Sequence, residues 1–215
     1  KGANATANYT VSENGSYTFK ITDMYDNVTT QTVNVSKIDK ILPSATTKGN
    51  PVDWTNQNQT LTITGSDAGG SGFKQIKLPS GVIVAGSSAT YTVSQNGSYS
   101  FVVYDNAGNS RTISEQVTKI DKEAPGGGIL GNPVNWTNKD ATLTLNAADT
   151  GGAGVKGVYL PNGTFVSTTT TASYVATQNG TYTFRTVDFA GNETSVSVTV
   201  TKIDKVAPTV ASVGG

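Results

Sequence analysis

Residues 94–109 read Ser-Gln-Asn-Gly-Ser-Tyr-Ser-Phe-Val-Val-Tyr-Asp-Asn-Ala-Gly-Asn. The Asn-Gly pair is typical of a tight turn, because both residues tolerate positive φ. After the turn, Tyr99, Phe101 and Val103 alternate with other residues, and this period of two places them on one face of a strand. The Asp-Asn-Ala-Gly-Asn segment that follows is rich in loop-forming residues. The stretch therefore predicts a half-buried strand between a turn and a loop.

The same stretch recurs at residues 12–27 and 177–192. Trp54 and Trp136 are 82 residues apart, and so are Asp67 and Asp149. A repeat of this length is large enough to bury a core of its own. The chain is therefore divided as follows: residues 1–40 are the C-terminal part of a preceding repeat, 41–123 and 124–207 are complete repeats, and 208–215 begin a following repeat. We expect residues 1–40 to be completed by chain outside this sequence or to be poorly ordered.

Each complete repeat contains short runs of alternating polarity separated by Gly, Pro and Asn clusters. This pattern is typical of an all-β sandwich, here with six to seven strands, and no amphipathic helix is indicated. In the first complete repeat the predicted strands cover residues 60–64, 73–78, 82–85, 89–94, 98–104 and 111–118. The linkers at 37–43 and 119–125 are short and contain proline, so we expect the sandwiches to form a rod. Residues 126–128, all glycine, are expected to loosen the second linker.

The composition argues against several classes of function. Lys plus Arg equals Asp plus Glu at 15 each, so net charge favours neither nucleic acid nor an anionic membrane as a partner. The absence of cysteine excludes disulfides and zinc-thiolate sites, and the absence of histidine removes the commonest general base. No apolar run is long enough to cross a bilayer, so we expect no membrane insertion. The carboxylates recur with the repeat, whereas a catalytic pair should be singular. We expect no enzyme activity and no required cofactor.

Several motifs occur in a fixed order in both complete repeats. They are Gly-Asn-Pro-x-x-Trp-Thr-Asn at 49–56 and 131–138, Leu-Pro-x-Gly at 78–81 and 160–163, Asn-Gly-x-Tyr-x-Phe at 96–101 and 179–184, Asp-x-Ala-Gly-Asn at 105–109 and 188–192, and Ile-Asp-Lys-x-x-Pro at 120–125 and 203–208. In these motifs the chain resembles the bacterial immunoglobulin-like (Big-type) tandem repeats of large extracellular surface proteins and adhesins. Tyr99 also resembles the tyrosine corner of such sandwiches. In the copy at 12–27, Met24-Tyr25-Asp26 replaces the loop motif, so its loop need not have the same shape.

The repeated aspartates support two interpretations. In a sandwich of this topology the incoming linker and two loops gather at one end, which brings together Asp39, Asp67 and Asp105, and likewise Asp121, Asp149 and Asp188. Calcium prefers several such oxygen ligands, and the resemblance to adhesin repeats implies calcium at inter-domain junctions. The alternative, which we favour, is that each Asp caps a turn through its own hydrogen bonds.

The aromatic residues are assigned to the core. We expect Tyr99, Phe101, Tyr182 and Phe184 to pack inside the sandwiches. Trp54 and Trp136 precede the first clear strand of each repeat, and we expect them to be partly buried against the linker. The alternative is an exposed platform on which a sugar stacks. We favour burial, because the sequence shows no neighbouring aromatic and polar partners.

These features together favour a non-enzymatic structural repeat region of a secreted or cell-surface protein, such as a stalk, a fibre or a surface-layer component. Its expected partners are neighbouring repeats of the same chain and, through lateral self-association into an extracellular filament, other copies. A second interpretation is an adhesin module that binds glycan or protein, which predicts an exposed aromatic cluster or a large apolar patch. A third is a set of accessory domains of an extracellular carbohydrate-active enzyme.

Overall fold

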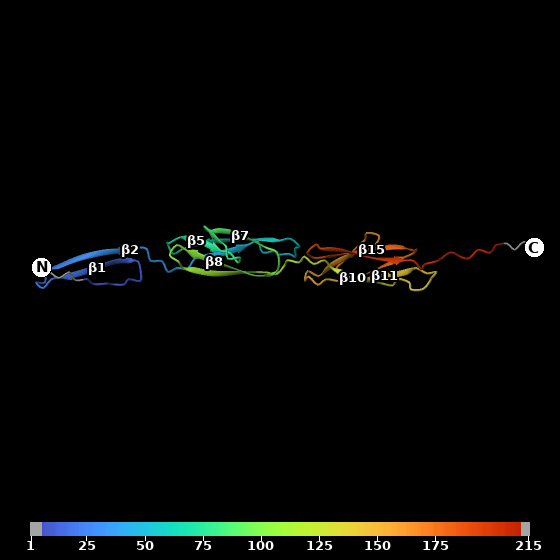
Figure 1. The fold of residues 1–215 in the computed structure, drawn as a ribbon, viewed down its shortest axis with the longest axis horizontal. Helices are drawn as coiled ribbons and strands as arrows, with labels where there is room; N and C mark the ends of the chain where they lie inside the picture. The colour runs from blue at the N-terminus through green and yellow to red at the C-terminus, as the bar shows by residue number, and fades with distance from the viewer. Residues whose placement is uncertain (1–5, 212–215) are drawn as a thin grey trace, which may run out of the picture. The chain divides into compact units, whose positions relative to one another are not determined.

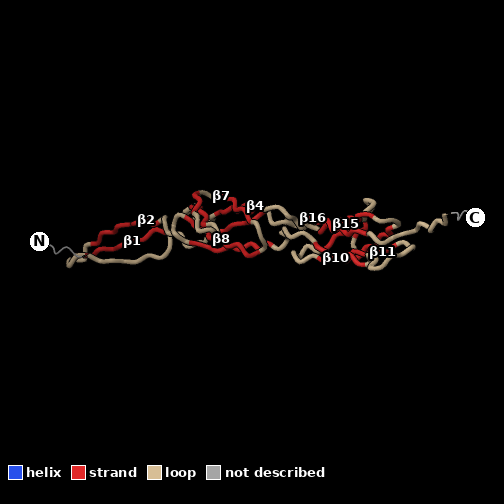
Figure 2. Tube along the Cα trace, turned by 45° about the vertical axis from the view of Figure 1, so that its right-hand side comes forward, coloured by secondary structure: helices blue, strands red, loops and turns tan. Residues whose placement is uncertain are grey.

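The computed structural model describes residues 6–211 and shows an all-β protein. These residues form the strands β1–β16 and no helix (Figure 2). Every pair of adjacent strands whose register is resolved is antiparallel. Residues 6–211 therefore contain no helix that is long and apolar enough to span a membrane.

The chain divides into two compact units, which we describe separately. The first consists of residues 1–48, 61–91 and 99–115, and the second of residues 49–60, 92–98 and 116–215. The first unit contains most of β1–β9, and the second contains β10–β16 (Figure 1). The repeat boundaries inferred from the sequence, at residues 40, 123 and 207, remain a prediction.

The first unit contains a hairpin and two sheets. The hairpin pairs β1 (Gly15–Thr22) with β2 (Val28–Val35). The three-stranded sheet has the order β3-β4-β7, and the four-stranded sheet has the order β6-β5-β8-β9. The strands of the two sheets are β3 (Ser44–Lys48), β4 (Gln59–Ser66), β5 (Phe73–Lys77), β6 (Ile83–Ala85), β7 (Ser88–Val93), β8 (Gly97–Asp105) and β9 (Ser110–Val117).

The second unit repeats the two sheets in the same order. The three-stranded sheet is β10-β11-β14 and the four-stranded sheet is β13-β12-β15-β16. Their strands are β10 (Gly126–Leu130), β11 (Ala141–Ala148), β12 (Val155–Tyr159), β13 (Phe165–Ser167), β14 (Thr171–Ala176), β15 (Gly180–Asp188) and β16 (Glu193–Val200). The glycines at 126–128, expected to loosen a linker, instead belong to β10, because β11 supplies their hydrogen-bond partners.

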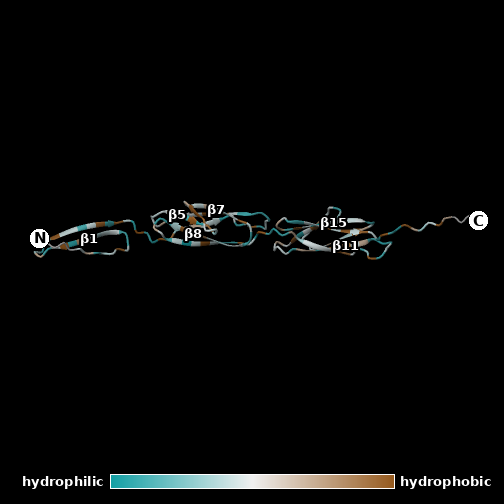
Figure 3. Cartoon of the chain, viewed as in Figure 1, coloured by the Kyte–Doolittle hydropathy of each residue, from teal (hydrophilic) through white to brown (hydrophobic). Residues whose placement is uncertain are grey.

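The six strands predicted in the first complete repeat correspond to β4–β9, whereas β3 was not predicted. In β8, Phe101, Val103 and Asp105 are buried while Ser98 and Ser100 are exposed. Bands of hydrophobic and hydrophilic residues alternate along the strands in Figure 3. Leu61 and Ile63 of β4 are fully buried, and Leu143 and Leu145 are buried at the equivalent positions of β11. Burial of the apolar row is the main driving force for this fold.

The second unit has a continuous hydrophobic core of its own. Its buried members are Ala141, Leu143, Leu145, Ala147, Val158, Ala172, Ala176, Phe184, Val200 and Ile203. Tyr182 packs against this core, and its hydroxyl donates to the carbonyl of Gln178 at 2.7 Å. This is the geometry of a tyrosine corner, which holds the turn before β15 against the strand. Tyr17 makes the same bond to Glu13 in the hairpin.

The hairpin is paired throughout, and the expectation that residues 1–40 are completed by chain outside this sequence or are poorly ordered stays a prediction. All eight residues of β1 have partners in β2. Its aromatic side chains keep the arrangement of the larger sheets: Tyr9 contacts Phe19 edge-on, as Tyr91 contacts Phe101. However, Phe19 is 38% exposed and Phe101 is fully buried. Residues 208–211 form no strand, and the rest of the repeat predicted to begin there lies outside the described residues.

We predict that Phe184→Ala lowers the local free energy of unfolding of β15 by about 3–4 kcal/mol, because it leaves a cavity in a closed core. Phe19→Ala, at the same position of the exposed hairpin, should cost β1 less than about 1.5 kcal/mol. Native-state amide hydrogen exchange on the two strands measures both values. Equal losses would contradict the assignment of Phe184 to the core.

Candidate functional site

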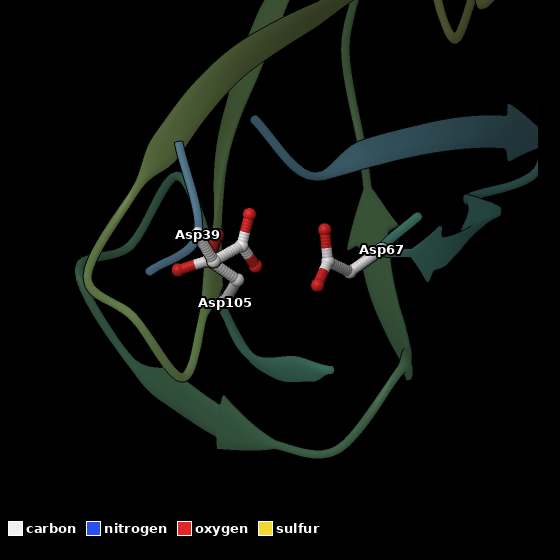
Figure 4. Close-up of side chains that lie close together, drawn as sticks. All are labelled: Asp39, Asp67 and Asp105. Atoms are coloured by element: carbon white, nitrogen blue, oxygen red, sulfur yellow. The ribbon is translucent and has the colours of Figure 1, made fainter. Parts of the chain in front are cut away.

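Three aspartates from separate segments of the first unit converge (Figure 4). Asp39 lies before β3, Asp67 follows β4, and Asp105 is the last residue of β8. One carboxylate oxygen of each lies within 4.8 Å of the others, and Asp105 is fully buried. We call this group triad 1. The structure thus brings together the three residues that the sequence grouped.

Every carboxylate oxygen of triad 1 accepts a hydrogen bond. Asp67 accepts from the backbone N–H groups of Gly69 at 3.1 Å and Gly72 at 2.9 Å. Asp39 accepts from those of Ile41 at 2.9 Å and Ser71 at 3.0 Å. Asp105 accepts from the backbone N–H of Asn109 at 2.8 Å and from its side-chain amide at 2.7 Å. The three carboxylates therefore organise the 67–72 loop, the 105–109 loop and the chain entering β3.

The second unit contains the same network, triad 2, formed by Asp121, Asp149 and Asp188. Asp121 accepts from Glu123 and Ala153, Asp149 from Gly151 and Gly154, and Asp188 twice from Asn192. Asp121 and Asp188 are both buried. Six oxygens and six N–H donors are thus matched one to one, as in triad 1.

Each triad requires a glycine at one position. A Cβ on Gly69 would lie 2.0 Å from Oδ1 of Asp39, and a Cβ on Gly151 would lie 2.0 Å from Oδ1 of Asp121. No larger residue fits unless the carboxylate moves away from its N–H donors. The glycine-rich loops at 67–72 and 149–154 are therefore shaped around an aspartate that is distant in sequence.

Sequence reasoning missed the contribution of the asparagines. Besides bonding Asp105, the side chain of Asn109 donates to the carbonyl of Asp39 at 3.1 Å, and Asn192 donates to Asp121 at 3.0 Å. They link the last loop of each sheet to the incoming chain. The four-residue spacing between Asp and Asn, present in all three copies, was the signal that could have identified this pair.

The loop of the hairpin keeps the same spacing and the same bonds. Asn27 donates to Asp23 through its backbone and its side-chain amide, both at 2.9 Å. Asp26 adopts φ of 62° where Gly108 has 96°. Aspartate tolerates this left-handed conformation better than most residues. The sequence left open whether this loop has the same shape, and the structure shows the same left-handed conformation at this position.

A second asparagine secures the chain at the other end of each repeat. Asn96 donates to the carbonyl of Ile120 at 2.9 Å and accepts from its N–H at 2.8 Å. Asn179 holds Ile203 in the same way, and Asn14 holds Ile38. The sequence indicated these Asn-Gly pairs only as turns. Their amides also bind the backbone of the following linker.

The chemistry of the triads is dominated by hydrogen bonding to the charged carboxylates. The hydroxyl of Ser71 and the backbone N–H groups of Ile41 and Ser71 lower the pKa of Asp39 below its ordinary value of 3.8. Three carboxylates this close repel one another, and the N–H dipoles offset part of that repulsion. Capping accounts for all six oxygens of each triad without a cation. Each oxygen still has a second lone pair, so the donor set is also compatible with calcium, which remains a prediction.

One assignment among the aromatic residues was wrong. Phe101 and Phe184 are fully buried, and Trp54, Tyr99 and Tyr182 are half-buried, but Trp136 is 70% exposed. The ammonium of Lys119 lies 5.1 Å from the ring of Trp54 and covers it. Lys202, at the equivalent position, instead donates to the carbonyl of Val134, which leaves the ring of Trp136 uncovered.

Comparisons with known proteins do not identify a family. No family model matches the chain, and a search of curated proteins found no match. Among solved structures, it is similar to the Bacteroides ovatus protein SGBP-B of a mixed-linkage glucan utilization locus, solved in complex with a mixed-linkage heptasaccharide. The identity is 15% and the TM-score 0.23 over 87% of this chain. The chain spans about half of that structure, 53%.

We predict that Gly151→Ala lowers the free energy of unfolding of the second unit by about 1–3 kcal/mol, because the new methyl group displaces Asp121 from its N–H donors. Gly126→Ala is the control, since a Cβ there meets no atom within 4 Å. Its effect should stay within about 0.5 kcal/mol. Guanidinium unfolding measures both, and equal effects would contradict the steric role of Gly151.

Capping and calcium give opposite results in calorimetry. If the aspartates act as caps, titration of the chain with CaCl₂ gives no saturable heat, and chelation leaves the thermal midpoint unchanged; this is the result we expect. Saturable heat with two sites per chain, reduced to one by Asp105→Asn, would establish calcium instead. Asp53→Asn, outside both triads, is the matched control.

Proposed function

We propose that this chain is a structural repeat region of a secreted or cell-surface protein, used as a stalk, a fibre or a surface-layer component. In this proposal residues 41–123 and 124–207 are tandem immunoglobulin-like sandwiches of the Big type arranged as a rod, residues 1–40 complete a preceding repeat, and residues 208–215 begin a following one. Neighbouring repeats and laterally associated copies are the proposed partners.

One observation carries the proposal: the polar network is copied together with the fold. The six N–H bonds of triad 1 recur in triad 2, and the bonds of Asn96 to Ile120 recur between Asn179 and Ile203. Most of these bonds join a side chain to backbone, which organises loops and linkers. A chain that repeats its loop-fastening bonds in each copy is suited to keeping its ends folded under load.

The same bonds favour a non-enzymatic role. Each triad carboxylate oxygen receives an N–H donor of its own chain, so the aspartates serve to hold loops together. The sequence contains neither histidine nor cysteine as an alternative. We therefore propose that the chain acts mechanically and requires no cofactor.

Pulling the chain by its two ends tests the proposal. Single-molecule force spectroscopy should show two unfolding events, each releasing roughly 25 nm of contour length, the extended length of about 82 residues less the folded length. Phe184→Ala should lower the force of one event and leave the other unchanged. A single event, or extension without a force peak, would contradict a load-bearing role.

A further inference from the structure

The two repeats have the same fold, so a side chain that differs between equivalent positions is not required by that fold. One row of side chains on the solvent-facing side of the four-stranded sheet differs in every member. In the second unit Phe165, Tyr159 and Arg185 are directly paired across β13, β12 and β15. In the first unit the same pairs are formed by Ile83, Lys77 and Val102. Both sheets have the same strand order, so the fold does not require the aromatic row.

The three side chains form a connected stack. The rings of Tyr159 and Phe165 are 4.7 Å apart and inclined by 42°. The guanidinium of Arg185 lies 3.9 Å from the centroid of the Tyr159 ring and is paired with Glu193. The first unit has Ser110 at the position of Glu193. We call Tyr159, Phe165, Arg185 and Glu193 the aromatic patch.

A further difference makes room for the patch. A Cβ on Gly157 would lie 2.6 Å from Cζ of Phe165 and 2.5 Å from the carbonyl oxygen of Val166. The glycine therefore lets the ring of Phe165 lie down on the sheet beside Tyr159. The first unit has Gln75 at this position. Five positions thus differ together to produce the aromatic patch.

The patch is partly exposed to solvent, and its one positive and one negative side chain are paired. Phe165 is 38% exposed, and the side chains of Arg185 and Glu193 are 39% and 42% exposed. The hydrogen bond to Glu193 raises the pKa of Arg185 above its ordinary value, so the guanidinium stays charged. Hydroxyl groups continue along β15 and β16 to one side of Arg185, where Thr183 bonds Ser197 and Thr181 bonds Thr199.

We propose that the aromatic patch binds a neutral pyranose ring of an oligosaccharide. The C–H face of the sugar stacks on the exposed ring of Phe165, which Tyr159 supports from beside it, and its hydroxyls bond the carboxylate of Glu193 and the guanidinium of Arg185. The matched charges disfavour an anionic ligand, because it would have to displace Glu193. Four side chains are too few for a stable protein interface, which needs about 800 Å² per partner, but they suit one sugar ring. This binding goes beyond the structural role and does not depend on it.

The test exchanges residues between the two repeats. Isothermal titration calorimetry uses cellohexaose, chitohexaose, maltohexaose and, as the anionic arm, hexagalacturonate. We expect saturable binding of at least one neutral hexasaccharide at one site per chain, with a dissociation constant on the order of 1 mM. Phe165→Ala should weaken it roughly tenfold.

The combined variant Tyr159→Lys, Phe165→Ile and Arg185→Val installs the residues of the first unit and should abolish binding while the protein remains folded. The reverse exchange, Gln75→Gly, Lys77→Tyr, Ile83→Phe, Val102→Arg and Ser110→Glu, should raise the stoichiometry from one to two. Circular dichroism confirms the fold of each variant.

Three results would overturn the proposal. They are absence of binding to all three neutral sugars, binding of hexagalacturonate alone, and unchanged binding by the folded combined variant. Trp136→Ala is the control for the exposed tryptophan. If it abolishes binding and Phe165→Ala does not, the sugar binds at Trp136 and the patch is only a cross-strand packing feature.

Discussion

Backbone N–H groups in the loops have no neighbouring strand to accept their hydrogen bonds, and in this protein aspartate side chains accept them. A backbone N–H withdrawn from water without a partner is costly, and an ionised carboxylate is the strongest acceptor a side chain offers. Asp67 and Asp149 each bind the loop that follows them, whereas Asp39 and Asp121 reach into that loop from the linker. The loops and the linker are thereby fixed by the same few bonds.

The arrangement also explains why small residues surround the carboxylates. Gly69 and Gly151 stand where any side chain would collide with an aspartate. The alternating strands supply the hydrophobic core, and the triads set how the chain enters and leaves it. Phe101 and Phe184 contribute to stability by filling the core, and the aspartates with their glycines contribute to both stability and the geometry of the loops.

Internal repetition is a useful control for function. Positions that keep the same contacts in both copies, such as Asp105 and Asp188, are explained by the fold. Positions that differ as a group between the copies, such as Lys77 and Tyr159 with their cross-strand neighbours, are not explained by the fold. The aromatic patch thereby supports a binding role beside a structural one, and the two roles use opposite classes of residue.

The sequence by itself determined most of the strands, the repeat and the membership of both aspartate triads, but not β3 or β10. Period-two alternation and glycine turns act locally, and a repeated Asp at each chain entry and loop has few places to go in a sandwich. It did not reveal that residues 126–128 form β10, that Trp136 is exposed, or that Tyr159, Phe165 and Arg185 stack in one row. Only the tertiary structure decided these points, because each depends on a segment that is distant in sequence. The glycines form a strand because β11 lies beside them, and Trp136 is exposed because Lys202 bonds Val134 and does not cover the ring. The three side chains stack because β13, β12 and β15 pair in a register that places them opposite one another.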